Sequence, residues 1–165
     1  MKFSQSVDLA LHALWYMARN APDKPVMIKD IAKSMRASES YLARVMLWLV
    51  KAGLLRSIRG KNGGFVFKVE PEQITIADVV MAIDTDTAEY HCPWEERGCT
   101  SYCGCALAGL FQEAQQQMLA VLRRMTIADI VNLGDQPPQW LVPVQDVVQI
   151  TPSENGQSSK PHVTM

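Results

Sequence analysis

The chain has 165 residues, of which 48% are hydrophobic and 20% charged, so it suits one globular domain with an appendage and is neither collagen-like nor wholly disordered. No apolar run approaches the ~20 residues of a membrane helix, and the N-terminus lacks the apolar block of a signal peptide, so we expect a cytoplasmic protein. The net charge of −1 hides an asymmetry: residues 28–68 carry 9 basic and 2 acidic side chains, which suits a polyanion partner as well as an ordinary solvated surface.

Three helices are predicted in the N-terminal part of the chain. Apolar residues recur at helical spacing over residues 3–20, which predicts an amphipathic helix. After a loop with two prolines, a short helix is predicted over 27–35 and another over 38–52, with Ser38 as its N-cap and Gly53 just past its end. Two short helices with a tight connection form a helix-turn-helix pattern.

A β-hairpin is predicted directly after these helices. Two strand-like stretches, 54–59 and 65–69, flank a basic, glycine-rich turn at 60–64 whose residues tolerate positive φ. A helix-turn-helix followed by such a hairpin is a winged helix. The expected fold is therefore mainly α with a small β-hairpin wing, extended by a long dimerisation helix.

The predicted winged helix offers a surface for DNA. The major groove of B-DNA admits one helix, and Arg44 can form a forked hydrogen-bond pair with a guanine. The wing tip would contact phosphates or the minor groove. The candidate DNA-binding residues are Ser38, Ser40, Tyr41, Arg44, Arg59, Gly60 and Lys61. Tyr41 could instead be half-buried in the core rather than contact DNA. The winged helix as a whole could instead bind a protein.

Two more helices are predicted beyond the wing. Thr75 is placed to cap a helix at 76–83, and a long helix is predicted at 106–125. The long helix has a near-heptad apolar stripe that exceeds what a small domain can bury, so it predicts a partner helix. The string TIADIV at 126–131 echoes TIADVV at 75–80, but six residues are too few to define a repeat.

The elements group into three regions. We expect a winged-helix DNA-binding domain at 1–74, a ligand-binding loop with the dimerisation helix at 75–133, and a partly disordered, polar tail at 134–165. This division places every basic feature of the hairpin in the first region and every cysteine in the second.

All four cysteines fall within 14 residues, as Cys92, Cys99, Cys103 and Cys105. A cytoplasmic chain rarely uses such a group for structural disulfides. Zinc sites prefer cysteines separated by two residues, and no such pair is present. Three thiolates spread along a loop, such as Cys92, Cys99 and Cys105, suit an iron–sulfur cluster. The spacing favours iron–sulfur over zinc, and a thiol-based redox switch is the third alternative.

A fourth ligand would have to come from elsewhere if only three cysteines serve. Asp8 and His12 lie four residues apart on the first predicted helix and so share one face. Each also has an ordinary explanation, since Asp8 suits the positive end of a helix dipole and His12 a surface position. Cys103 and His91 are further alternatives.

These features together resemble the IscR/NsrR-type bacterial transcription regulators, a winged-helix family whose members often hold iron–sulfur clusters. The resemblance covers residues 1–133. It rests on the recognition-helix string SYLARVMLWLVKAGLL, the wing RGKNGGF, the helix ITIADVV, the cysteine loop and the string TIADIV.

The resemblance implies a homodimer joined by the long helix and a near-palindromic DNA operator. It also implies a cluster held by Cys92, Cys99 and Cys105, with Cys103 extra and the first gap one residue longer than usual. Ala108 stands where the biogenesis branch has a histidine ligand. Asp8 matches the aspartate that the nitric-oxide-sensing branch donates from the other subunit, and a redox-sensing branch would use Asp8 and His12 with a two-iron cluster.

The sequence therefore predicts a dimeric DNA-binding transcription regulator, a repressor, controlled by an iron–sulfur cluster that senses nitric oxide, redox state or iron–sulfur status. A 4Fe–4S cluster is favoured and a 2Fe–2S cluster is possible. The alternative is a cluster-free winged-helix protein regulated by thiols or a metal. We expect no enzymatic activity, because no nucleophile–base pair, phosphate loop or paired carboxylate with a catalytic rationale is apparent.

Overall fold

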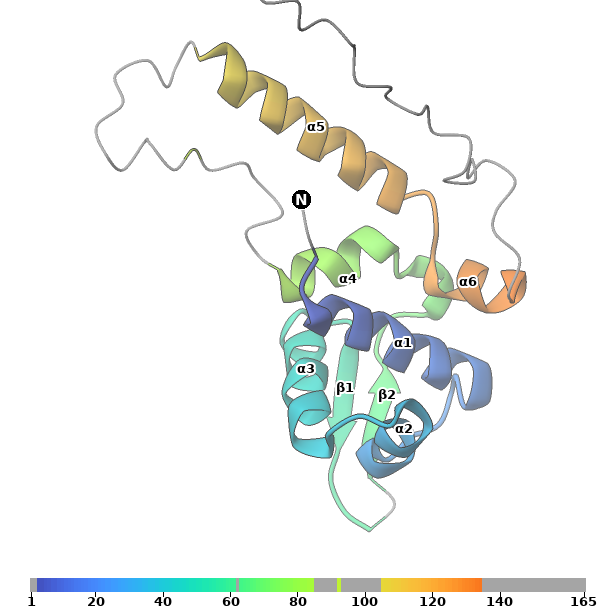
Figure 1. The fold of residues 1–165 in the computed structure, drawn as a ribbon. Helices are drawn as coiled ribbons and strands as arrows, with labels where there is room; N and C mark the ends of the chain where they lie inside the picture. Colours follow the sequence, from blue (N-terminus) through green and yellow to red (C-terminus); the bar gives the residue numbers. More distant parts are fainter. Residues whose placement is uncertain (1–2, 62, 85–91, 93–104, 135–165) are drawn as a thin grey trace, which may run out of the picture. The chain divides into compact units, whose positions relative to one another are not determined.

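The computed structural model describes residues 3–61, 63–84, 92 and 105–134, all of which belong to one unit (Figure 1). The elements in chain order are α1 (Gln5–Asn20), α2 (Ile28–Met35), α3 (Glu39–Lys51), β1 (Leu55–Ile58), β2 (Gly64–Phe67), the 3-10 turn η1 (Pro71–Gln73), α4 (Ile76–Ile83), α5 (Ala106–Leu122) and α6 (Ile127–Leu133). The predicted fold class, mainly helical with a β-hairpin wing, is confirmed. The predicted region boundaries and the polar tail lie partly outside the described residues and stay predictions.

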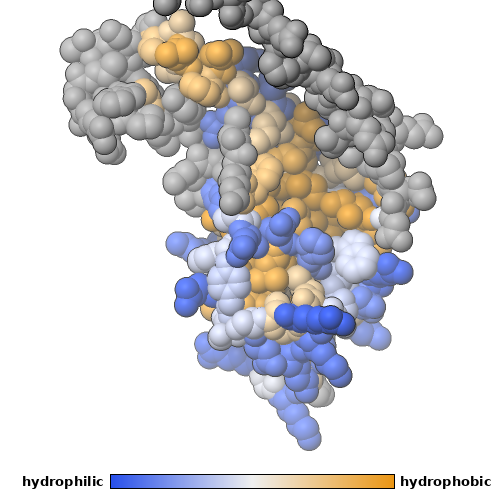
Figure 2. Space-filling view, in the orientation of Figure 1, coloured by the Kyte–Doolittle hydropathy of each residue, from blue (hydrophilic) through white to orange (hydrophobic). Residues whose placement is uncertain are grey.

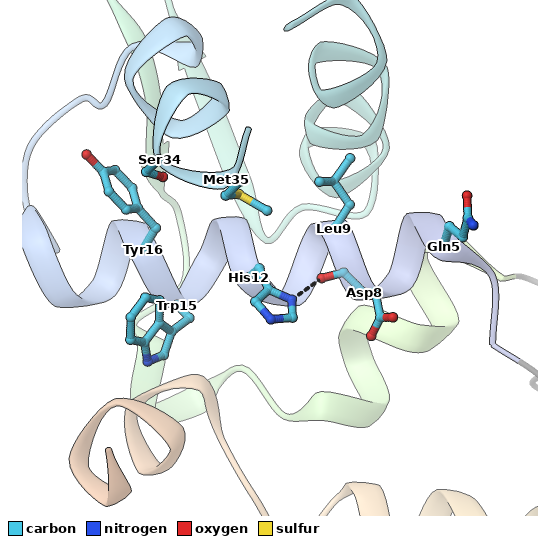
Figure 3. Close-up of a pocket in the computed structure, with 8 residues that line it drawn as sticks. All are labelled: Gln5, Asp8, Leu9, His12, Trp15, Tyr16, Ser34 and Met35. Atoms are coloured by element: carbon cyan, nitrogen blue, oxygen red, sulfur yellow. Dashed lines mark hydrogen bonds between the residues drawn. The ribbon is translucent and has the colours of Figure 1, made fainter. Parts of the chain in front are cut away.

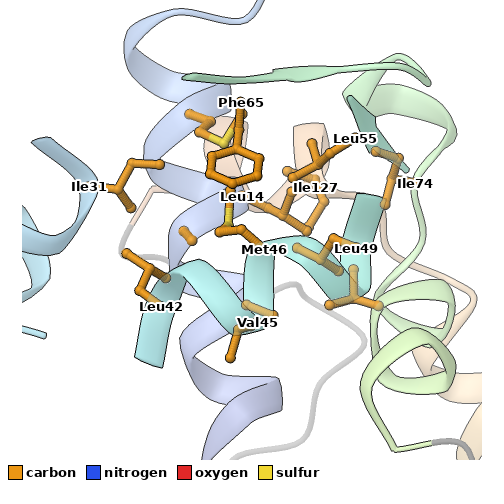
Figure 4. Close-up of a cluster of buried hydrophobic side chains, with 14 of the residues drawn as sticks. Leu14, Ile31, Leu42, Val45, Met46, Leu49, Leu55, Phe65, Ile74 and Ile127 are labelled. Carbon is orange, nitrogen blue, oxygen red and sulfur yellow. The ribbon is translucent and has the colours of Figure 1, made fainter. Parts of the chain in front are cut away.

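The core forms where α1, α3 and the hairpin meet (Figure 4). The predicted inner face of α3, which is Leu42, Val45, Met46 and Leu49, is completely buried. Leu14 of α1 and residues of the hairpin pack against it. Since these side chains belong to segments of one chain, the winged helix forms its core without a partner.

The wing is held by a contact that lies outside the hairpin. β1 and β2 pair antiparallel, from Leu55 opposite Phe67 to Ile58 opposite Gly64. Val26, in the loop before α2, adds a one-residue bridge to Phe65. Gly64 makes this approach possible: its φ is +154°, and a Cβ there would lie 2.2 Å from the carbonyl oxygen of Val26.

The two TIAD strings lie against each other. Thr75 and Thr126 form an antiparallel bridge, and each begins a helix with a complete capping box, closed by Asp78 and Asp129 respectively. Hydrogen bonds to Thr126 hold the pKa of the Asp129 carboxyl below its ordinary value. The echo between the strings is thus a pair of matched helix starts, the first opening α4 and the second opening α6.

The apolar stripe of α5 points largely away from its own chain. Leu107 is 66% exposed, Leu110 63% and Phe111 48%. The buried residues of α5 are instead Ala108, Gln115 and Leu119. The helix ends at Leu122, three residues earlier than predicted, because the chain then turns towards the Thr126 bridge. Within the described part of the chain, no helix has both the length and the apolar character needed to cross a bilayer.

Candidate functional site

One end of the unit gathers the features that suit DNA. Figure 1 shows α2, the N-terminal end of α3 and the wing tip at this end, and Figure 2 shows that its surface is hydrophilic. The chain reverses between α2 and α3 at Arg36, whose left-handed backbone (φ 52°) closes α2. This tight connection sets the start of α3 beside the wing.

The predicted DNA-binding residues of α3 lie at its exposed start. Ser38 occupies the N-cap position, and its hydroxyl lies 3.0 Å from that of Ser40. Arg44 is exposed and forms no ion pair within the described residues. Tyr41 is 38% exposed, but its hydroxyl lies 2.6 Å from that of Ser6 on α1 and is already engaged within the protein.

The wing tip presents a second set of predicted DNA contacts. Arg59, Gly60 and Lys61 are all exposed, and Gly60 has a φ of +112°. In the part of the chain that the structure describes, no carboxylate pairs with Arg59 or Lys61. Their charges are therefore available to neutralise phosphates.

The predicted ligands on α1 line a cavity of about 450 Å³ between α1 and α2. Figure 3 shows the His12 ring and the Asp8 carboxylate one turn apart on the same side of the helix, and both residues are exposed. Nδ1 of His12 donates to the carbonyl oxygen of Asp8 at 2.8 Å, since a carbonyl can only accept. In the tautomer that carries its proton on Nδ1, the lone pair of the ring is on Nε2. Within the described residues, the Asp8 carboxylate accepts no hydrogen bond.

The structure describes only two of the four cysteines. Cys92 and Cys105 are half-buried free thiols, and Cys105 occupies the N-cap position of α5. Cys99, Cys103 and His91 lie outside the described residues. Among the described residues, no three His, Cys, Asp or Glu side chains gather into a metal site. The donor types available, thiolate sulfur and one exposed carboxylate, fit iron–sulfur ligation better than they fit Mg²⁺ or Ca²⁺, which prefer oxygen ligands.

Sequence reasoning missed two contacts at the start of α1. Asp84, the residue that follows α4, accepts hydrogen bonds from the backbone N–H of Ser4 at 3.0 Å and from its hydroxyl at 2.7 Å. Ser6 is buried and contacts Tyr41 as described above. No local pattern predicts these pairs, because the residues of the first lie 80 positions apart.

Comparison with known proteins gives one consistent answer. The family model Rrf2, described as an iron-dependent transcriptional regulator, matches residues 3–133. The regulator NsrR of Shouchella clausii is 33% identical over 79% of this chain and 89% of its own length. The regulator IscR of Yersinia enterocolitica is 28% identical over 82% of each chain.

Solved structures are similar to the same part of the chain. CymR, the global cysteine regulator of B. subtilis, superposes with a TM-score of 0.64 at 25% identity, covering 82% of this chain and 99% of its own. IscR of T. potens superposes with a TM-score of 0.60 at 24% identity, covering 80% of this chain and 87% of its own. Both share the winged-helix fold described above.

Proposed function

The chain belongs to the Rrf2 family of transcriptional regulators, and we propose that it represses transcription as a homodimer. Its affinity for a near-palindromic operator would depend on an iron–sulfur cluster. Membership of the family makes the chain a DNA-binding regulator and confirms that it is not an enzyme. The dimer, the operator and the cluster are parts of the proposal, as is its site of action in the cytoplasm.

The un-neutralised basic side chains at one end of the unit carry the DNA part of the proposal. Arg44 at the start of α3 would enter the major groove, while Arg59 and Lys61 at the wing tip would contact the neighbouring backbone or minor groove. Gly60 lets the wing backbone approach the duplex closely. Ser38 and Ser40 would donate to phosphates beside the helix N-terminus.

The outward apolar stripe of α5 supports the homodimer. Leu107 and Leu110 are each more than 60% exposed, although burying a leucine contributes ~1.5–3 kcal/mol. A second copy of α5 offers a matching stripe, and closed two-fold dimers are the commonest assemblies of soluble proteins. A dimer also places two recognition helices on two half-sites, which is why we propose a near-palindromic operator.

The cluster would be held by Cys92, Cys99 and Cys105 of one subunit and by the partner subunit's Asp8. In support, the Asp8 carboxylate is exposed and accepts no hydrogen bond within the described residues, and no complete donor set gathers in one chain there. His12, an exposed residue, is the alternative fourth ligand through Nε2, and would go with a 2Fe–2S cluster rather than the favoured 4Fe–4S form. Cys103 is the remaining thiol. Such a cluster supplies a centre that reacts with nitric oxide and changes redox state.

The test is spectroscopic. The protein is purified without oxygen, iron and sulfide are counted per chain, and absorption and Mössbauer spectra are recorded before and after nitric oxide, with operator affinity measured alongside. About four irons per chain, lost on nitric oxide together with a change in affinity, is the expected result. Two irons that cycle reversibly would identify a redox sensor and return His12 to the ligand set.

Two matched variants identify the α1 ligand. Asp8→Ala should destabilise the cluster, whereas His12→Ala should leave the spectrum unchanged. An unchanged cluster lifetime in Asp8→Ala would remove Asp8 from the proposal. Cys103→Ser should also retain the cluster, and its loss there would mean that a different set of three thiols serves.

A cluster-free regulator is the second candidate, favoured by the similarity to CymR. In that case Cys103 and Cys105, separated by one residue, would respond as thiols. A colourless, iron-free protein whose operator affinity changes with a thiol oxidant, and not after Cys105→Ser, would establish this alternative.

A further inference from the structure

The first turn of α1 contacts both the end of α4 and the start of the recognition helix α3. On one side it contacts Asp84, the residue directly before the segment that carries the cysteines. On the other side it contacts Tyr41, in the first turn of the recognition helix α3. Asp8, the proposed ligand, lies in the same first turn of α1. These contacts connect the start of α1 both to the end of α4 and to the DNA-binding helix.

The Asp84 contact fixes the position of the helix start. Its two carboxylate oxygens accept separately from the backbone N–H and the hydroxyl of Ser4, which is the N-cap residue. Hydrogen bonds to an ionised acceptor are stronger than neutral ones, and a carboxylate at a helix N-terminus also interacts favourably with the helix dipole. A displacement of Asp84 would therefore move the start of α1 or break both bonds.

The Tyr41 contact fixes the start of α3 relative to the start of α1. Ser6 is 8% exposed, and its hydroxyl forms a hydrogen bond with the Tyr41 hydroxyl at 2.6 Å. Leaving a buried hydroxyl unpaired is costly, so the bond favours a fixed spacing between the two helices. Ser4 and Ser6 belong to one turn, closed by the bond from the N–H of Val7 to the carbonyl of Ser4 at 3.0 Å.

We infer that the pairs Asp84–Ser4 and Ser6–Tyr41 couple the C-terminal end of α4, at Asp84, to the recognition helix through the first turn of α1. Tyr41 is then a positioning residue, whose hydroxyl sets where α3 begins, rather than a direct DNA contact through that hydroxyl. The use of the coupling in sensing rests on the proposed function, whereas the coupling itself is a property of the metal-free chain.

The experiment measures amide hydrogen exchange in the metal-free, full-length protein. Asp84→Ala, Tyr41→Phe and the double variant are compared with wild type, with Asp23→Ala and Tyr16→Phe as matched controls that lose the same groups elsewhere. Ser4→Ala is a milder variant that removes only one of the two bonds if Asp84→Ala fails to fold. Exchange in the hairpin reports any general loss of stability.

We expect Asp84→Ala to speed exchange about 2- to 10-fold in the first turns of both α1 and α3, as loss of net hydrogen-bond stabilisation predicts. In the Tyr41→Phe background, Asp84→Ala should still act on α1 but add nothing at α3. Equal effects of Asp84→Ala at α3 in both backgrounds, or no effect in either, would overturn the coupling.

A second arm separates this inference from the proposed function. The ratio of operator affinities with and without the cluster is measured for wild type and Tyr41→Phe. Positioning predicts that the ratio falls about 2- to 10-fold in Tyr41→Phe, whereas a direct DNA contact would weaken both affinities equally and contradict the role given to Tyr41. A wild-type ratio of one would contradict the cluster proposal, while the exchange data would still decide whether the coupling exists.

Discussion

The recognition helix α3 and the long helix α5 are both amphipathic, yet their apolar faces have opposite surroundings. Leu42, Val45, Met46 and Leu49 of α3 are completely buried by other segments of the same chain. Leu107 and Leu110 of α5 are largely exposed. The same sequence pattern thus indicates a partner without saying whether that partner is the chain itself or a second copy. The apolar face of α3 is covered within one chain, whereas the described residues of its own chain leave the apolar face of α5 largely exposed.

The largest expected effect comes from placing charges in the exposed apolar stripe of α5. Leu107→Glu with Leu110→Glu should dissociate the dimer, at a cost on the order of 4 kcal/mol or more, since each leucine buried at the interface contributes ~1.5–3 kcal/mol. Sedimentation should show a monomer whose circular dichroism is still that of a folded winged helix. Gln112→Glu with Gln116→Glu adds the same charge to exposed polar positions of α5 and should leave a dimer. An unaffected dimer in the leucine variant would place the interface elsewhere.

Leu49→Ala tests the α3 side. Loss of this fully buried side chain should lower the free energy of unfolding by about 3 kcal/mol, through lost transfer energy and the cavity left behind. The loss, measured by urea denaturation, should not depend on protein concentration. In Leu107→Ala, by contrast, the stability difference should depend on concentration, because the proposed dimer would bury that position and the single chain does not. Concentration dependence in both variants would show that the winged helix is not independent of the dimer.

Local patterns predicted much of the fold because local forces fix those features. The inner face of α3 follows from spacing, Gly53 ends the helix with a φ of +81°, and Thr75 caps α4 as expected. Contacts between residues far apart in the sequence have no comparable local pattern that would predict them. Val26 with Phe65 joins segments from separate elements, and each residue alone is an ordinary apolar side chain.

In the candidate site too, local spacing predicted some features, whereas others depend on contacts between distant residues. The helical spacing of Asp8 and His12 predicted their shared face, whereas Arg44 and Arg59 are exposed and their roles in DNA binding stay predictions. The role of Asp84 depends on a contact with a residue 80 positions away, which composition cannot reveal. The ligand roles of the cysteines stay predictions, since Cys99 and Cys103 lie outside the described residues.

Smaller effects are expected at the DNA end, where Arg44→Ala and Arg59→Ala should differ in kind. Arg44→Ala should weaken operator binding by about 1–3 kcal/mol and relax specificity at one base pair. Arg59→Ala should weaken binding to all sequences similarly and lower the salt dependence by about one counterion. Fluorescence anisotropy over a range of salt concentrations measures both. Arg123→Ala removes the same charge beyond α5 and should change neither. A sequence-specific loss in Arg59→Ala would reassign the wing to base recognition.

Thr126→Ala tests the contribution of the capping box that begins α6. Loss of this cap should lower stability by about 1 kcal/mol at neutral pH. The bonds from Thr126 lower the pKa of Asp129, so their contribution is present above the ordinary value of 3.8 and is lost as the pH falls through the lower folded-state value. The difference between wild type and variant should therefore shrink in acid. Thr75→Ala is the matched cap on α4, and a pH-independent difference in Thr126→Ala would mean that packing, rather than the carboxylate, sets the effect.

The smallest expected effect lies between α2 and α3, where Arg36 adopts a left-handed backbone with a φ of 52°. That conformation costs a non-glycine residue ~1–2 kcal/mol, and the greater unfolded-state freedom of glycine offsets about half of the gain on substitution. Arg36→Gly should therefore raise the free energy of unfolding by about 0.5 kcal/mol at any protein concentration, measured by urea denaturation. Arg36→Ala removes the same charge but keeps the backbone strain, and should not stabilise the protein. Equal stabilisation by Ala and Gly would mean that charge repulsion in the basic surface, rather than backbone strain, is what Arg36 adds to the DNA-binding part of the chain.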